Sequence, residues 1–288
     1  MLDQAERLRR LANGEGNIKD SNNKTRIITV TSGKGGVGKS NFVVNISISL
    51  VEMGKKVLIF DADIGMGNDD VLMGIYSKYN IMDLVNGKVT IDQVITEGPL
   101  GVHLLPGGSG LNNIEDLQEN QRTLFLKQIE GIEGYDYIFI DTGAGISKNV
   151  LAFISASDEF ILVTTPEPTS LTDGYSLLKA VDHFKIKNKA NIVVNKVLDE
   201  KEGNQTFSKF KTAVNKFLSL DVNYLGIIYE DRKLIMAVRE QEPFVLSYPN
   251  SEAAKCVRII SEKLVGNERV EKGSGAQNLF KKLFNIFS

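Results

Sequence analysis

The chain has 288 residues, 42% hydrophobic and 24% charged, which is ordinary for a folded globular protein and excludes disordered and fibrous classes. Thirty-six acidic residues against 34 basic ones give a net charge of -2, which offers nucleic acid no overall positive field. Cys256 is the only cysteine, so the sequence holds neither a disulfide framework nor a cysteine cluster for zinc or iron–sulfur.

The N-terminal segment, residues 1–24, combines a short helical pattern with a polar linker. Residues 3–11 place Leu8 and Leu11 on one side of a helix, and residues 13–24 are rich in glycine and asparagine. The first residues lack the pattern of a secretory signal peptide, and no apolar run reaches the roughly 18–20 residues that span a bilayer. The sequence therefore favours a cytoplasmic protein with an N-terminal extension.

Residues 25–265 alternate apolar strand patterns with amphipathic helical patterns. Strands are predicted at residues 27–31, 57–60, 102–105, 137–140, 160–164, 192–195 and 224–228, and the clearest helices at 40–53, 173–184, 205–218 and 252–264. Continuous apolar strands joined by helices are typical of parallel sheets that are buried on both faces. The pattern therefore predicts an α/β fold with a mostly parallel, seven- or eight-stranded sheet and helices on both faces.

A glycine-rich loop follows the first predicted strand. Residues 33–40 (GKGGVGKS) fit the phosphate-loop pattern G-x-x-x-x-G-K-[ST], and an amphipathic helix leaves the loop as the pattern requires. The backbone N–H groups of such a loop cradle phosphates, while Lys39 would reach the β- and γ-phosphates and Ser40 would bind Mg²⁺. The predicted nucleotide contacts are Gly33, Gly35, Gly36, Val37, Gly38, Lys39, Ser40 and the adjoining Asn41.

Carboxylates follow two of the later strands. Asp61 and Asp63 end the second strand at positions i and i+2, which places both on one side of the pleat. Asp141 ends the strand at 137–140 and precedes a glycine-rich turn. An apolar strand with a terminal aspartate is weak evidence alone, but after a phosphate loop it predicts a Walker B aspartate that binds Mg²⁺ and a switch loop that senses the γ-phosphate.

The C-terminal segment combines a glycine-rich linker, residues 266–277, with an amphipathic pattern at 278–288. One wide apolar face is formed by Leu279, Phe280, Leu283, Phe284 and Phe287. The pattern predicts a helix that lies in the plane of a membrane surface, with weak binding that a dimer would strengthen through avidity. The alternative is a helix that docks on the protein's own core.

The loop sequence KGGVGKS, with Lys34 directly before the glycine pair, resembles the deviant phosphate loop of the MinD/ParA and nitrogenase-iron-protein class. The resemblance implies an ATP-dependent homodimer in which Lys34 contacts the phosphates bound by the other subunit. It further implies that Asp63 orients the attacking water and that Asp61 supports Mg²⁺ and Lys39. By the same resemblance, nucleotide contacts are expected from Asn68, Asn195 and Glu230.

The head sequence DQAERLR, the DTGAG turn at residues 141–145 and the segment PEPTSLTD at 166–173 resemble the FlhG family of MinD-like ATPases, which controls flagellar number and placement. That resemblance implies a partner GTPase of the FlhF type, contacted through Asp3, Gln4 and Arg7. It also implies contact with flagellar C-ring proteins and with an anionic membrane surface on the cytoplasmic side, bound in the ATP state.

Other assignments within and outside this class compete. The head and the linker before the first strand argue against a division-site MinD. A ParA-like DNA partition ATPase is disfavoured by the net charge of -2 and by the tail. An iron–sulfur scaffold needs paired cysteines, which one cysteine cannot supply, and intact Lys34, Asp63 and Asp141 favour hydrolysis over a non-enzymatic nucleotide-binding scaffold.

Overall fold

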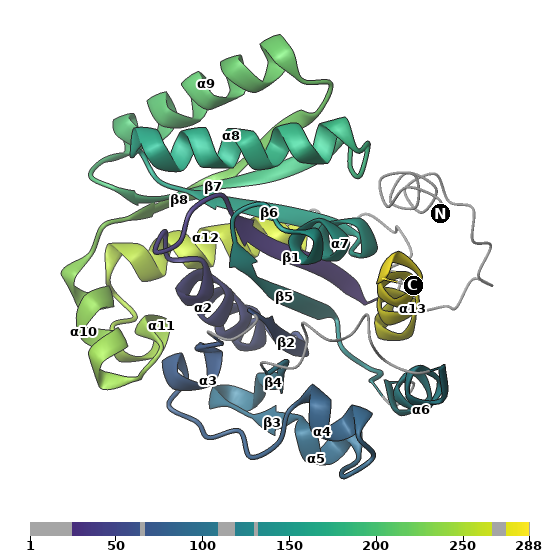
Figure 1. Ribbon diagram of the computed structural model, residues 1–288. Coiled ribbons are helices and arrows are strands. Elements are labelled where there is room, and N and C mark those ends of the chain that lie inside the picture. Colours follow the sequence, from purple (N-terminus) through teal and green to yellow (C-terminus); the bar gives the residue numbers. More distant parts are fainter. Residues whose placement is uncertain (1–24, 64–66, 109–118, 130–131, 267–274, 288) are drawn as a thin grey trace.

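A sheet of eight strands runs through the molecule, which is a computed structural model that describes residues 25–63, 67–108, 119–129, 132–266 and 275–287 (Figure 1). The strands are β1 (Arg26–Ser32), β2 (Val57–Ala62), β3 (Thr96–Glu97), β4 (His103–Pro106), β5 (Tyr137–Ala144), β6 (Glu159–Thr164), β7 (Lys189–Val197) and β8 (Asp221–Tyr229). Their order is β3-β4-β2-β5-β1-β6-β7-β8, and the β3–β4 pair is antiparallel while the other pairs are parallel.

Helices cover both faces of the sheet. They are α2 (Lys39–Glu52), α3 (Asp69–Leu72), α4 (Ile81–Val85), α5 (Ile91–Val94), η1 (Pro99–Gly101), α6 (Glu119–Ile129), α7 (Lys148–Ala156), α8 (Pro168–His183), α9 (Glu200–Phe217), α10 (Arg232–Glu240), α11 (Phe244–Ser247), α12 (Glu252–Gly266) and α13 (Gly275–Phe287). Helices α2 and α12 pack on one face, and α6, α7, α8, α9 and α13 pack on the other.

The strands are continuously apolar because successive side chains enter two different cores. In β2, Leu58 and Phe60 belong to the core beneath α6, α7 and α13, whereas Val57 and Ile59 belong to the core beneath α2 and α12. This alternation has the period of two that a pleated strand imposes. The sequence-based prediction of a sheet buried on both faces is therefore confirmed.

The strands and helices predicted for residues 25–265 are all present, but several boundaries differ. Strand β3 has two residues, too few for a sequence pattern. Helix α8 begins at Pro168, five residues before the predicted start, because a proline at the first helical position lacks only an N–H that has no helical partner there. Helix α9 also begins earlier, where Asp199 accepts a hydrogen bond from the Glu202 N–H and caps it.

The C-terminal helix α13 lies against α6 and α7 (Figure 1). Leu279, Phe280, Leu283 and Phe284 are each at most 4% exposed, and the Phe280 ring contacts the rings of Phe60 and Phe125. The apolar face predicted to enter a membrane therefore covers the protein's own core in this arrangement, as in the docked alternative. The side chain of Phe287 lies outside what the structure describes.

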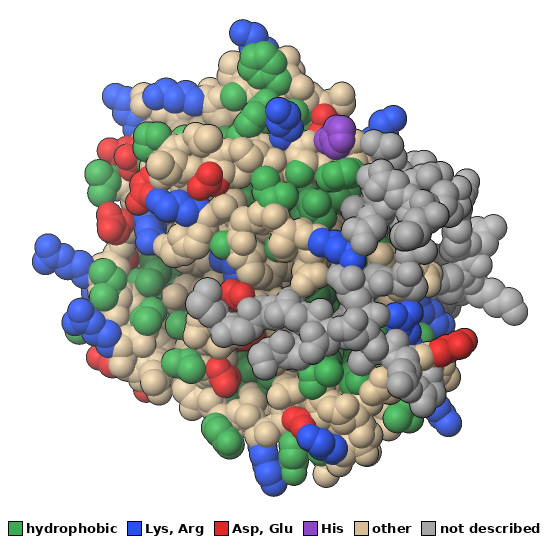
Figure 2. Space-filling model, viewed as in Figure 1, with side chains coloured by type: hydrophobic (Ala, Val, Ile, Leu, Met, Phe, Trp, Pro, Cys, Tyr) green, Lys and Arg blue, Asp and Glu red, His purple; other side chains and the backbone are tan. Residues whose placement is uncertain are grey.

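The partner contacts predicted for the N-terminal segment are not described by the structure. Asp3, Gln4 and Arg7 lie outside the described residues. Among the helices that the structure describes, none combines the length and hydropathy needed to cross a bilayer. On the face shown in Figure 2, Lys and Arg side chains of the described residues are scattered, with Asp and Glu side chains among them.

The docking of α13 predicts that Phe280→Ala lowers the free energy of unfolding by about 3–5 kcal/mol, the usual effect of removing a buried phenylalanine. Phe217 of α9, which is 67% exposed, supplies the control, and Phe217→Ala should change stability by less than about 0.5 kcal/mol. Urea titration of the full chain measures both. Equal effects of the two changes would contradict the docked arrangement.

Candidate nucleotide site

A cavity of about 1010 Å³ opens at the carboxyl ends of the central strands. Its walls come from the loop between β1 and α2, the ends of β2, β5, β7 and β8, and helices α3, α7 and α10. Ligands of open α/β sheets bind at this edge, where the loops that leave neighbouring strands diverge. The predicted residues that line the cavity are Gly35, Gly36, Val37, Gly38, Lys39, Ser40, Asn41, Asp63, Asn68, Asn195 and Glu230.

The phosphate loop adopts a conformation that its glycines permit. Gly36 and Gly38 have φ values of 76° and 91°, which residues with a Cβ rarely adopt. Gly33 packs so closely on α8 that a Cβ would lie 2.2 Å from the carbonyl carbon of Asp173. Since no side chain in the described part of the chain caps the N-terminus of α2, its first N–H groups remain available to an anion in the cavity.

Lys39 is buried, and its Nζ donates a hydrogen bond to Asp141 Oδ1 at 2.5 Å. Burial disfavours the charge of the ammonium group, but Asp141 outweighs this effect and raises the pKa of Lys39 above its ordinary value. The Ser40 hydroxyl also bonds to Asp141. The loop lysine, the loop serine and the Walker B aspartate predicted from the sequence therefore meet at one point.

Asp61 and Asp69 join Asp141 in a buried cluster of carboxylates. Asp61 lies directly opposite Asp141 in the parallel β2–β5 pair, and Asp69 begins α3 with no exposed surface. Burial, followed by the charge of Asp141, raises the pKa of Asp61 to about 7. The same causes raise the pKa of Asp69, and neither of its carboxylate oxygens has a hydrogen-bond partner among the described residues.

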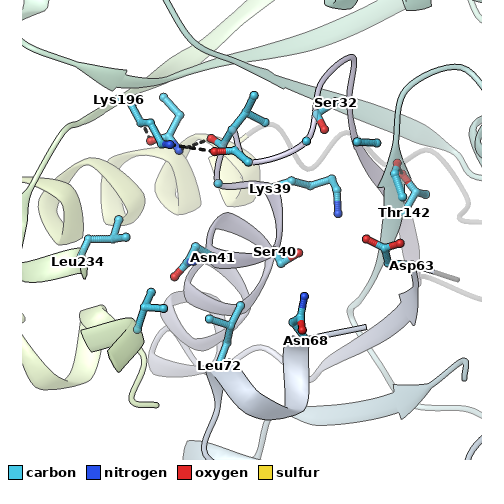
Figure 3. A pocket seen from close by; sticks show the side chains of 18 of the residues that line it. Ser32, Lys39, Ser40, Asn41, Asp63, Asn68, Leu72, Thr142, Lys196 and Leu234 are labelled. Atoms are coloured by element: carbon cyan, nitrogen blue, oxygen red, sulfur yellow. Dashed lines mark hydrogen bonds between the residues drawn. The ribbon is translucent and has the colours of Figure 1, made fainter. Parts of the chain in front are cut away.

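Asp63 and Asn68 are more exposed and point into the cavity beside Lys39 and Ser40 (Figure 3). Asp63 Oδ1 lies 3.2 Å from the position that a Cβ on Gly143 would occupy, so it faces the loop at the end of β5. A small ligand at the phosphate loop would therefore meet a carboxylate from β2 and the predicted switch loop from β5.

Lys34 lies outside the cavity lining and is held by its own chain. Its Nζ donates hydrogen bonds to Glu167 Oε2 and Thr169 Oγ1, both at 3.0 Å, at the start of α8. The hydrogen bond from Lys34 lowers the pKa of the Glu167 carboxyl. Both charged side chains are at the surface, so the pair is weak and can exchange partners.

The far wall of the cavity contains residues that the sequence did not single out. Leu72, Leu234, Ile235 and Val238 form an apolar wall that faces the phosphate loop from α3 and α10 (Figure 3). Two polar residues were also missed, namely Asp69 and Lys196. Lys196 had a sequence signal, since it directly follows Asn195, whereas Asp69 is recognisable only from contacts between distant segments.

The buried carboxyl of Asp69 predicts that Asp69→Asn stabilises the protein without nucleotide by about 1–3 kcal/mol at neutral pH, because an amide is neutral and needs no proton to stay so in the folded state. A raised pKa means that the folded wild type keeps a proton on Asp69 that the unfolded chain loses above about pH 4. The contribution of Asp69 to the free energy of unfolding of the wild type therefore falls as pH rises above that value. The gain from asparagine should therefore grow with pH.

Thermal unfolding between about pH 4.5 and 8, measured as variant minus wild type, tests this expectation. Asp70→Asn is the control, because Asp70 is partly exposed and its carboxylate accepts a hydrogen bond from the Val71 N–H. If the gain in stability were independent of pH, or equal for the two variants, the buried carboxyl of Asp69 would not be its cause.

Comparison with known proteins finds one matching family and several similar proteins. The family described as an AAA domain matches residues 25–194. The chain is 36% identical to the flagellum site-determining protein YlxH of Helicobacter pylori, over 98% of both chains. It is 32% identical to the antiactivator FleN of Pseudomonas aeruginosa, over 83% of this chain and 86% of that protein.

Solved structures of two relatives share the fold. MinD of Pyrococcus horikoshii in complex with Mg-ADP superposes with a TM-score of 0.67 and 26% identity, over 86% of this chain and all of that one. MinD of Aquifex aeolicus in its complex with MinC gives a TM-score of 0.68 and 27% identity, over 86% and 98% of the two chains. With its phosphate loop, Asp63 and Asp141 in place, the chain belongs to the MinD/ParA-type P-loop ATPases and hydrolyses ATP.

Proposed function

We propose that the chain is an ATP-driven dimerisation switch that binds a membrane surface through α13 and regulates the number and placement of flagella. The observation that carries the proposal is the burial of the apolar face of α13 on α6 and α7. The same side chains cannot cover the core and enter a lipid surface at once. Docking therefore competes with membrane binding.

The position of α7 supports a link between nucleotide and tail. This helix follows the loop at the end of β5, and its residues Val150 and Phe153 line the cavity. The Phe153 ring contacts Phe60, and Phe60 contacts Phe280 of α13. A loop that responds to the γ-phosphate would therefore move a helix on which the tail is packed.

The catalytic part of the proposal assigns a role to each residue at the cavity. The N–H groups of the phosphate loop and Lys39 bind the phosphates, and Asp63 orients water for attack on the γ-phosphorus. Lys34 leaves Glu167 and reaches the phosphates of the partner subunit. Among the described residues, no group of three His, Cys, Asp or Glu side chains is placed to hold a metal ion.

Mg²⁺ is nevertheless suited to this site, because it is commonly held by one or two protein groups together with phosphates and water. Asp141 and Asp61, with the hydroxyl of Ser40, offer the oxygen ligands that it prefers. When bound, the ion would neutralise phosphate charge during transfer. It would also compensate the clustered carboxylates, whose buried charge Lys39 balances only in part.

The biological part of the proposal rests on relatives. One relative is named for the flagellum site and another as an antiactivator, which supports a flagellar role over division-site or DNA partition roles. In this role, Asp3, Gln4 and Arg7 would contact an FlhF-type GTPase, and the body would contact C-ring proteins. The switch would act in the cytoplasm and on the inner face of the membrane.

The membrane role predicts that the full chain co-sediments with anionic liposomes in ATP and much less in ADP or without nucleotide. Binding should fall to background when residues 278–288 are removed, because a single apolar face supplies the contact. A Phe280→Ser, Phe284→Ser variant provides a second test without truncation. Sedimentation that ignores nucleotide, or survives both changes, would refute the gated anchor and leave the ATPase assignment intact.

The proposed reach of Lys34 across the dimer predicts that Lys34→Ala lowers turnover by about 10³-fold or more, as expected for a cation supplied in trans. Asp63→Ala should also be inactive. A mixture of the two variants should regain part of the activity, because the Asp63→Ala subunit supplies Lys34 to the intact Asp63 of its partner.

Steady-state ATP turnover of each variant alone and of equimolar mixtures measures this complementation. A mixture no more active than the separate variants, in a sample shown to contain mixed dimers, would place the action of Lys34 within its own subunit.

A further inference from the structure

Strand β7 ends in a bulge at Lys196. Asn195 pairs with Ile228 and Val197 pairs with Tyr229, so β7 contains one more residue than β8 at this point. Lys196 has a φ of 57°, in the left-handed region that side chains other than glycine seldom adopt. Two other non-glycine residues with such values, Lys185 and Gln241, end helices, whereas Lys196 lies within a strand.

The bulge brings two consecutive side chains to the same loop. Along a regular strand, the side chains of Asn195 and Lys196 would point to opposite faces of the sheet. Here the Asn195 Nδ2 donates to the Val37 carbonyl at 2.7 Å, and the Lys196 Nζ donates to the Gly36 carbonyl at 2.8 Å (Figure 3). Bulges next to functional sites commonly re-aim side chains in this way.

Holding these two carbonyls also sets the direction of two N–H groups. In a planar trans peptide the C=O and N–H bonds point to opposite sides, so a carbonyl pulled outward turns the following N–H inward. The Gly36 carbonyl precedes the Val37 N–H, and the Val37 carbonyl precedes the Gly38 N–H. Both N–H groups belong to the loop that cradles phosphates.

We propose that Lys196 is a positioning residue for nucleotide binding, which acts with Asn195 to preset the N–H groups of Val37 and Gly38 toward the phosphates. Asn195, for which the resemblance implies a nucleotide contact, donates its Nδ2 hydrogen bond to the loop. The fit is close, because a Cβ on Gly38 would lie 2.4 Å from that nitrogen. The inference rests on the ATPase assignment and not on dimerisation or membrane binding.

Preset donors bind a ligand more tightly because less ordering accompanies binding. The ammonium group of Lys196 is exposed, so water competes for it and the contact is modest. Lys196→Met should therefore raise the Kd for ADP and ATP by about three- to tenfold, within the range of one ordinary hydrogen bond. Because Lys196 touches the loop and not the reacting atoms, kcat at saturating ATP should change less than KM.

The experiment compares Lys196→Met with Lys189→Met, which removes an exposed lysine at the other end of β7. Fluorescent ADP and ATP analogues give Kd, and hydrogen exchange without nucleotide reports on the loop itself. The proposal expects faster exchange in residues 36–38 of Lys196→Met, before any ligand is added. Lys189→Met should match the wild type in both measurements.

Two further variants separate the ammonium group from the backbone. Lys196→Gly adopts the positive φ without strain but has no ammonium group, so it should show the same loss of affinity as Lys196→Met. Lys196→Arg keeps a cation and should retain most of the affinity. If Lys196→Met weakened binding but left hydrogen exchange of the loop unchanged, Lys196 would contact the ligand directly and the positioning role would be overturned. If Lys196→Met left the Kd unchanged, Lys196 would have no role in binding.

Discussion

The ion pair between Lys39 and Asp141 joins the phosphate loop to the central strand β5. The other carboxylates and the helices of the site lie around this pair. Asp61 stands opposite Asp141 on the neighbouring strand, so two like charges share a buried site with one ammonium group. Taking charges out of water is costly unless each is compensated, and here the compensation is partial. The free energy of the site therefore depends on which cations and phosphates occupy it.

This constraint extends to the surrounding helices. The loop that leaves β5 beside Asp141 leads into α7, which carries part of the cavity wall on one side and α13 on the other. Phe60, which contacts α13, directly precedes Asp61 in β2. A residue of the charged cluster and a residue that contacts the tail are thus consecutive in β2, so a rearrangement at the site can reach the tail over a short distance.

The sequence predicted the motifs that are defined by neighbouring residues of the chain. It missed the features that depend on contacts between distant segments. A glycine-rich loop between a strand and a helix, and Asp141 at the end of an apolar strand, are local patterns. The role of Asp69 was missed because two consecutive aspartates resemble a solvated helix start, and the bulge at Lys196 has no signature in hydrophobic periodicity. The amphipathic pattern of the tail was recognised, but an apolar face suits lipid and protein equally, so its docked position required the structure.

The extent of tail burial limits what ATP can do alone. Four large side chains of α13 are each at most 4% exposed. At about 1.5–3 kcal/mol each, their burial contributes on the order of 6–12 kcal/mol to docking, from which the entropy of ordering the helix must be subtracted. Reversing a two-state equilibrium from 1:99 to 99:1 needs about 5.5 kcal/mol of differential binding. ATP and dimer contacts need not supply all of it, because lipid offers the released face a second apolar environment. In the proposed switch, nucleotide and membrane would therefore act as coupled ligands of the undocked form, each binding more tightly when the other is present.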